Sequence, residues 1–306
     1  MIFAARGVMV SLAFFAILYS FLSLLLVLAW HGLQRVRQVK FSANALFWLR
    51  LFPFALSATI TVFLTFPSFL LFEAHSLDED FGTFALCLCA LLLLGAGLLR
   101  VVTTQARTRH AVSEWLQANR AKSGADTVSQ TAKNALPIML VGIRAPRVLV
   151  SETARALLTE GELHVAVQHE MEHLRSRDNL KKAIFNFVLF PGMARLERRW
   201  LEAAELDADL GAVSNRKEAL DLASALVKLS RRLPSPAVPA LATGLIGTAE
   251  SVVVRVERLL EWESEADSVP RFRYLIPVAL ATILTVAAHL GPALNMVHSL
   301  TERLVP

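Results

Sequence analysis

Four long runs of apolar residues divide the chain. They cover residues 8–30, 51–72, 81–102 and 274–297. Each has about the 20 residues that an α-helix needs to cross the hydrocarbon core of a bilayer. Prolines, a glycine, a histidine and an asparagine interrupt the last run, which a membrane helix tolerates where neighbouring helices satisfy its backbone. The pattern predicts a mainly α-helical membrane protein with four transmembrane helices.

The basic residues between these runs predict their orientation. The segment between the first two runs carries Arg35, Arg37, Lys40 and Arg50, whereas segment 73–80 carries no Lys or Arg. Cytoplasmic loops are the ones enriched in Lys and Arg. We therefore expect an external N-terminus, three transmembrane helices within 1–102, a cytoplasmic domain at 103–273, and a fourth helix with a short external tail at 274–306.

The cytoplasmic segment has the pattern of an α+β domain. Residues 123–134 read as a polar linker, and 136–142 and 146–151 read as two strands of a β-hairpin. Thr159 and Glu162 form a capping box that begins the next helix. Residues 183–192 are apolar but too short to span, so we expect them to enter the interface or pack against the bundle. Helices are expected at 194–213, 215–232 and 247–262.

Composition supports a membrane protein and argues against nucleic-acid binding, a disulfide framework and a zinc ribbon. Hydrophobic residues make up 55% of the 306 residues and charged ones 19%, which is too apolar for an ordinary soluble domain. The net charge of +5 lies mainly beside the apolar runs, which favours contact with membrane lipid over nucleic acid. Cys87 and Cys89 lie inside the third run, where their spacing offers neither a disulfide framework nor a zinc ribbon.

The stretch QHEMEH contains the candidate chemistry. His169 and His173 are four residues apart, so on a helix both imidazoles lie on one face and can share a zinc ion. Glu170 lies between them and can accept a proton from a metal-bound water. A chain of this composition would contain His-Glu-x-x-His by chance in roughly one case in a hundred. The motif predicts a single zinc ion and hydrolytic chemistry.

Helical geometry separates Glu170 from Glu172. Leu163, Val167, Met171 and Leu174 define an apolar face, with Glu170 near its middle and Glu172 roughly opposite. A buried carboxylate without a partner costs several kcal/mol or becomes protonated. We therefore expect Glu170 to face a metal and its water, and Glu172 to be solvated.

A third metal ligand is expected in the segment EAAELDADLG, because catalytic zinc sites usually have three protein ligands and an open position. Glu205 and Asp209 share a helix face, so one can bind metal while the other holds a ligand histidine. Glu202 is a competing candidate, since all three lie opposite the stripe of Leu196 and Trp200. A solvated polar face would produce the same pattern.

Three features of the sequence resemble the BlaR/MecR-type antirepressor membrane metalloproteases. The first is a pair of strands and a capped helix that contains HExxH and is followed by the dipeptide Arg-Asp. The second is an apolar patch followed by Glu-x-x-x-Asp. The third is the run RVERLL at 255–260. The resemblance implies a zincin-like α+β domain in a bacterial cytoplasmic membrane. It favours Glu205 as the third zinc ligand and Asp209 as the carboxylate that holds a histidine.

The resemblance also implies a function. Members cleave themselves or a cytoplasmic transcriptional repressor of the winged-helix type, so a protein or peptide is the expected substrate. The β-lactam receptors carry an external penicillin-binding domain after the fourth span, whereas this chain ends at Pro306, so we expect a short member with the protease module only.

The substrate-binding strand and the class of protein each have alternatives. An extended peptide could pair with a candidate edge strand, although the same run could be internal to a small sheet; this strand comprises Arg147, Val148, Leu149, Val150 and Ser151. A HtpX/Ste24-like protease of quality control or precursor processing shares HExxH, but usually places full membrane spans between its motifs. A non-catalytic membrane signalling or scaffold protein is disfavoured because the ligands and the base are all intact.

Overall fold

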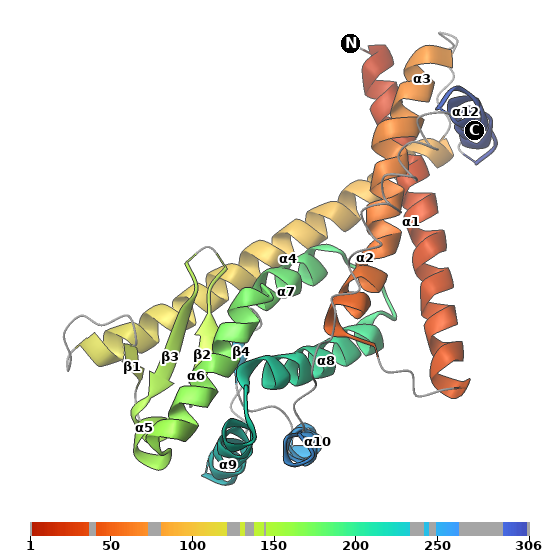
Figure 1. The fold of residues 1–306 in the computed structure, drawn as a ribbon. Coiled ribbons are helices and arrows are strands. Elements are labelled where there is room, and N and C mark those ends of the chain that lie inside the picture. The colour runs from red at the N-terminus through yellow and green to blue at the C-terminus, as the bar shows by residue number, and fades with distance from the viewer. Residues whose placement is uncertain are drawn as a thin grey trace.

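The computed structural model describes residues 2–36, 41–72, 81–120, 129–131, 138–143, 145–232, 242–244, 249–262 and 290–304. Long helices form one end of the molecule, and a small sheet with shorter helices forms the other (Figure 1). In chain order the first part contains α1 (Ile2–Val36), α2 (Ala43–Ile60), the π-helical turn η1 (Thr61–Thr65), α3 (Phe66–Phe72) and α4 (Phe81–Arg120).

The second part alternates short strands and helices. It contains β1 (Ser129–Thr131), β2 (Ile138–Val141), β3 (Arg147–Ser151), α5 (Glu152–Leu157), α6 (Glu160–Arg175), α7 (Asp178–Phe187), α8 (Ala194–Ala212), α9 (Arg216–Arg232), β4 (Ala242–Gly244) and α10 (Ala249–Leu260). The last helix, α12 (Leu290–Leu304), returns to the long helices and packs on η1 and α3.

Among the described residues, three helical segments are long and apolar enough to cross a membrane, namely Ala5–Leu33, Ala43–Phe72 and Phe81–Ser113. This confirms the membrane character that the first three apolar runs predicted. Their outer surfaces expose large apolar side chains such as Phe21, Phe63 and Leu99, which suit contact with lipid. Most of the predicted fourth run, residues 274–289, lies outside the described residues.

Helix α2 begins at Ala43, eight residues before the apolar run at 51–72. Its first N–H groups have partners that hydropathy does not reveal. The Ser42 hydroxyl accepts from the Ala45 N–H at 3.3 Å, and Asp207 on α8 accepts from the Ala43 N–H at 3.0 Å. These contacts satisfy backbone donors that a helix otherwise leaves unpaired.

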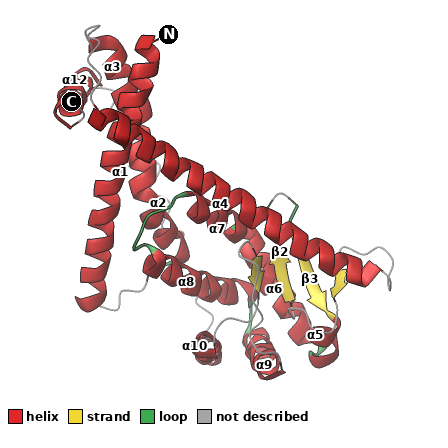
Figure 2. Cartoon of the chain, turned by 180° about the vertical axis from the view of Figure 1, so that it is seen from behind, coloured by secondary structure: helices red, strands yellow, loops and turns green. Residues whose placement is uncertain are grey.

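Helix α4 continues far beyond the predicted end of its span at residue 102. Its second half crosses the sheet, which Figure 2 shows from behind. There Val112 packs against a small cluster formed by Met139, Val141 and Leu149. Tertiary packing therefore extends a helix whose local hydropathy falls after the membrane segment.

The strands form a four-stranded sheet in the order β1-β3-β2-β4. The hairpin of β2 and β3 has the predicted antiparallel pairing, with Leu140 opposite Val148. β1 lies inside the segment predicted as a linker and pairs parallel with β3. Of the two alternatives for 147–151, the edge strand is wrong and the internal strand is confirmed, because β3 has a neighbour on each side. Among the described strands, β1 and β4 form the edges.

The capping box begins α6 as predicted. The Thr159 hydroxyl accepts from the Glu162 N–H, and the Glu162 carboxylate accepts from the Thr159 N–H at 2.8 Å. Glu162 also accepts from Ser224 and Lys228 of α9, at 2.5 and 2.7 Å. Local capping and packing against α9 thus fix where α6 starts and which side faces the core.

The apolar segment 183–192 packs against the membrane helices. The Tyr19 hydroxyl donates to the Leu189 carbonyl at 2.8 Å, and the buried Arg50 donates to Val188 O and to Glu197. On α4, a Cβ added at Gly97 would lie 2.1 Å from the Phe187 carbonyl oxygen. Only glycine allows this approach, so α7 and α4 are in direct backbone contact.

Candidate metal centre

Helix α6 carries the three motif residues into the interior. His169 and Glu170 are fully buried, and His173 is 1% exposed. The face of α6 that is buried contains Val165, Ala166 and both histidines, whereas Leu163 and Val167 are only partly buried. α8, α9 and β2 pack around α6, so a wider arc is covered than the predicted apolar stripe.

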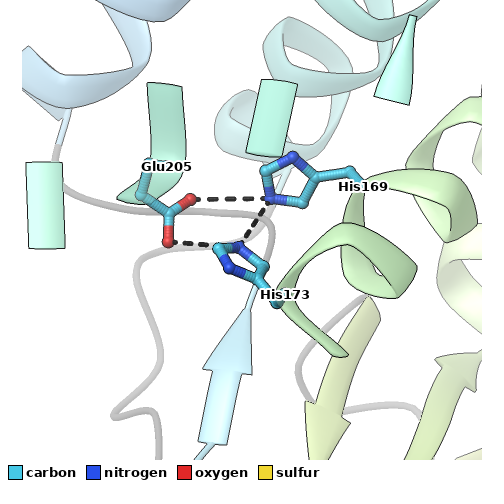
Figure 3. A group of neighbouring side chains, drawn as sticks. All are labelled: His169, His173 and Glu205. Carbon is cyan, nitrogen blue, oxygen red and sulfur yellow. Dashed lines mark hydrogen bonds and ion pairs between the residues drawn. The ribbon is translucent and has the colours of Figure 1, made fainter. Parts of the chain in front are cut away.

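Glu205 on α8 faces both histidines (Figure 3). The two Nε2 atoms lie 3.2 Å apart. Glu205 Oε2 lies 3.6 Å from His169 Nε2, and Oε1 lies 3.6 Å from His173 Nε2. A tetrahedral zinc with bonds of about 2.05 Å has ligand atoms about 3.3 Å apart. The three side chains are therefore arranged to hold one metal ion.

Each histidine is oriented by a carboxylate on its other ring nitrogen. His173 Nδ1 lies 2.7 Å from Asp178 Oδ2 on α7, and His169 Nδ1 lies 2.9 Å from Asp209 Oδ1 on α8. Such contacts fix the tautomer and leave Nε2 for the metal. The sequence predicted that either Asp209 or Glu205 holds a ligand histidine in this way. It assigned no role to Asp178, although Asp178 follows His173 by only five residues.

Arg255 on α10 connects two of the carboxylates. Its Nη1 lies 2.9 Å from Glu205 Oε2, and its Nε and Nη2 each donate to Asp209 at 2.6 Å. Burial alone would raise the pKa of each acid, but the Arg255 guanidinium holds the pKa of Glu205 and of Asp209 below the usual range. Both acids are therefore anionic, as metal binding requires.

Burial alone would lower the pKa of His169, but its contacts with Asp209 and Glu205 raise that pKa to about 9. The metal-free site therefore holds a proton where a cation would bind. This is the electrostatic signature of a site built for positive charge.

Glu170 occupies a different environment. Its Oε2 accepts from the Leu140 N–H of β2 at 2.9 Å, and burial raises its pKa above the usual value. Asn179 on α7 donates to the carbonyls of Leu140 and Gly142, at 3.4 and 3.1 Å, and so fixes β2 beside α6. A carboxylate with a raised pKa is suited to accepting and returning a proton.

Two other glutamates lie outside the centre. Glu202 is 46% exposed and pairs with Arg199 at 2.9 Å, so the structure brings Glu205 rather than Glu202 to the histidines. The prediction that Glu172 is solvated is wrong. Its side chain is 17% exposed, pairs with Arg175 and lies against Gly211 of α8. That contact comes from helix packing, which the angular position of Glu172 on an isolated helix does not reveal.

Sequence reasoning also missed Lys182 on α7. Burial lowers its pKa, while the nearby charges of Glu205, Asp178 and Glu170 favour its protonated form. Lys182 follows Asp178 by one helical turn, so it lies on the same face of α7 as the carboxylate that holds His173.

No protein-family model matches the chain, and no curated protein sequence matches it. Its function is therefore inferred from the geometry of the buried residues. Two imidazoles and one carboxylate are the protein donor set of many catalytic zinc sites. With Glu170 alongside, this set can activate water for attack on a carbonyl carbon.

Proposed function

We propose that this protein is a membrane-embedded zinc metalloendopeptidase that hydrolyses peptide bonds on the cytoplasmic side. The observation that carries the proposal is the convergence of His169, His173 and Glu205 within 4.8 Å, beside the buried Glu170. Zinc is the metal that best suits a two-imidazole, one-carboxylate set of this size. We also propose that α6, α8 and the small sheet form a zincin-like α+β domain.

Bound to His169, His173 and Glu205, a zinc ion would supply Lewis acidity to a water molecule and to the scissile carbonyl. Glu170 accepts a proton from the attacking water as the new C–O bond forms. It then delivers that proton to the leaving nitrogen as the C–N bond breaks, so the peptide is cleaved by one water molecule. The raised pKa of Glu170 makes it suitable for both transfers.

Strand β4 marks the place where an extended substrate would pair. It is antiparallel to β2, with Thr243 opposite Leu140, whose N–H holds Glu170. It also contacts α6 and α7. A peptide that paired with the outer edge of β4 would lie on the side of the sheet next to α6 and α7, the helices that carry Glu170, both histidines and Asp178. We therefore assign substrate pairing to this edge of the sheet in place of β3.

The proposal includes a location and a substrate class, which the sequence supports. The Lys and Arg distribution favours a multi-pass protein of a bacterial cytoplasmic membrane, with an external N-terminus and a cytoplasmic metal centre. The run at 274–297 is proposed as the fourth span. The resemblance to BlaR/MecR-type proteases favours signalling by cleavage of a winged-helix repressor or of the chain itself.

The test uses the full chain purified in detergent. Wild type should contain about one zinc per chain and should cleave itself or an added protein substrate. Glu170→Gln should keep the zinc and lose cleavage, because the ligands remain while the base is removed. The proposal fails if the wild-type chain binds no zinc, or if Glu170→Gln cleaves as fast as wild type.

A further inference from the structure

Lys181 lies behind one of the histidines and points toward a membrane helix. Its Nζ is 3.3 Å from Asp178 Oδ1, while the other oxygen of Asp178 binds His173 Nδ1 at 2.7 Å. The two carboxylate oxygens therefore have separate partners, the lysine and the histidine. Lys181 is 12% exposed and Asp178 is 3% exposed, so this pair is largely removed from water.

The remaining contacts of Lys181 come from α2. Its Nζ donates to Asn44 Oδ1 at 3.0 Å and lies 5.7 Å from the centre of the Phe47 ring. Phe47 is itself 6% exposed, in the cluster that joins α2 to α7 and α8. A cation over an aromatic face, with a hydrogen bond to an amide oxygen, has a defined position.

A second contact joins the same end of α2 to the other metal-binding helix. The Ala43 N–H donates to Asp207, which lies between Glu205 and Asp209 on α8. The N-terminal turn of α2 thus contacts both α7 and α8. Between them, these helices carry one proposed ligand and the carboxylates that orient both histidines.

We infer that Lys181 is a positioning residue for the proposed metal centre, and that α2 is the element that positions Lys181. The chain of contacts runs from Asn44 and Phe47 to Lys181, to Asp178 and to His173. It fixes the imidazole so that Nε2 faces the metal. A segment long enough to cross the membrane is therefore part of the support of a zinc ligand. This inference rests on the proposed function.

The experiment measures zinc affinity of the full chain in detergent by competition with a chromophoric chelator. Lys181→Met keeps the aliphatic stem and removes the charge, and should weaken zinc binding about tenfold, as is typical for residues that support a ligand. Lys181→Arg keeps the charge and should stay closer to wild type. Asn44→Ala should weaken binding roughly two- to threefold, because Asn44 is exposed.

The double variant tests whether the contacts form one chain. If Asn44 acts through Lys181, adding Asn44→Ala to Lys181→Met should cause no further loss of zinc affinity. Unfolding of the metal-free variants is measured in parallel. Their midpoints should stay close to wild type, which a general loss of structure would not allow.

Arg199→Met is the matched control. It removes the same charge from an exposed pair with Glu202 on α8 and should leave zinc affinity unchanged. The inference is overturned if wild type binds zinc and Lys181→Met binds it equally well. It is also overturned if Asn44→Ala has the same effect in the Lys181→Met background as alone. A wild-type chain that binds no zinc would instead overturn the proposed function, and this inference with it.

Discussion

Arg255 and Asp209 form a buried bidentate ion pair, in which Nε and Nη2 of Arg255 each lie 2.6 Å from a carboxylate oxygen of Asp209. The same guanidinium reaches Glu205, so one cation holds two acids beside His169. Such an arrangement is costly to disrupt, because removing one partner leaves uncompensated charge in the interior.

Arg255→Met should lower the free energy of unfolding of the metal-free chain by about 3–5 kcal/mol. Zinc should recover part of this loss, since the metal supplies positive charge to Glu205. The stabilisation caused by zinc should therefore be larger in the variant than in wild type. Unfolding curves with zinc and with chelator test this, and an equal zinc effect in both chains would contradict it.

Glu205 and Glu202 should differ sharply in metal binding. Glu205→Ala removes a ligand atom and should weaken zinc affinity by more than about 100-fold, since even residues outside the ligand set cost 10- to 100-fold. Glu202→Ala removes an exposed carboxylate and should retain zinc. Metal content after dialysis against a weak chelator distinguishes them. Loss of zinc from Glu202→Ala alone would overturn the assignment.

Zinc binding should depend on pH through His169. The protonated imidazole stabilises the metal-free fold fully below its ordinary pKa of 6.5, and this contribution is lost as pH rises through about 9. Zinc requires the neutral ring, so it must displace this proton. Apparent affinity should rise about tenfold per pH unit across that window and level off above it. Competition titrations across this range test the slope.

Asp209→Asn is the control for this pH dependence. Removing the carboxylate next to His169 lowers the pKa of the ring, so the rise of zinc affinity should end at a lower pH. Arg199→Met, an exposed change of charge on the same helix, should leave the profile unchanged. Identical profiles for Asp209→Asn and wild type would show that His169 does not control the proton release.

Glu162 should affect stability without affecting metal content. Its carboxylate joins the helix cap to Ser224 and Lys228, so Glu162→Gln should cost about 1–3 kcal/mol in free energy of unfolding. Burial alone would raise the pKa of Glu162, but Lys228 and Ser224 hold it below 4.5. This stabilisation is present above pH 4.5 and is lost as pH falls through the lower folded pKa. The difference from wild type should shrink over that range, while at neutral pH the variant and wild type should contain the same amount of zinc per chain.

Local signals predicted the parts of the centre that lie on one helix. The Thr159–Glu162 box and the four-residue histidine spacing are encoded within one segment, and Glu205 lies on the helix predicted at 194–213. The roles of Arg255 and Lys181 were not predicted, because their contacts depend on how α10 and α2 pack against the helices of the metal centre. The sequence left open whether β3 is an edge or an internal strand for a similar reason, since β1 pairs with it from a polar segment with little strand signal.

The uninterrupted course of α4 has a mechanical consequence. The 24 residues from Gly97 to Arg120 extend for about 35 Å. Gly97 is in contact with the Phe187 carbonyl, so a tilt of α4 could turn the helix about this contact. A tilt of about five degrees in the bilayer would move the far end of the helix by roughly 3 Å, and membrane helices readily adopt such tilts. The sheet whose Leu140 N–H binds Glu170 packs against this part of α4, so such a tilt would shift the sheet relative to the proposed metal centre.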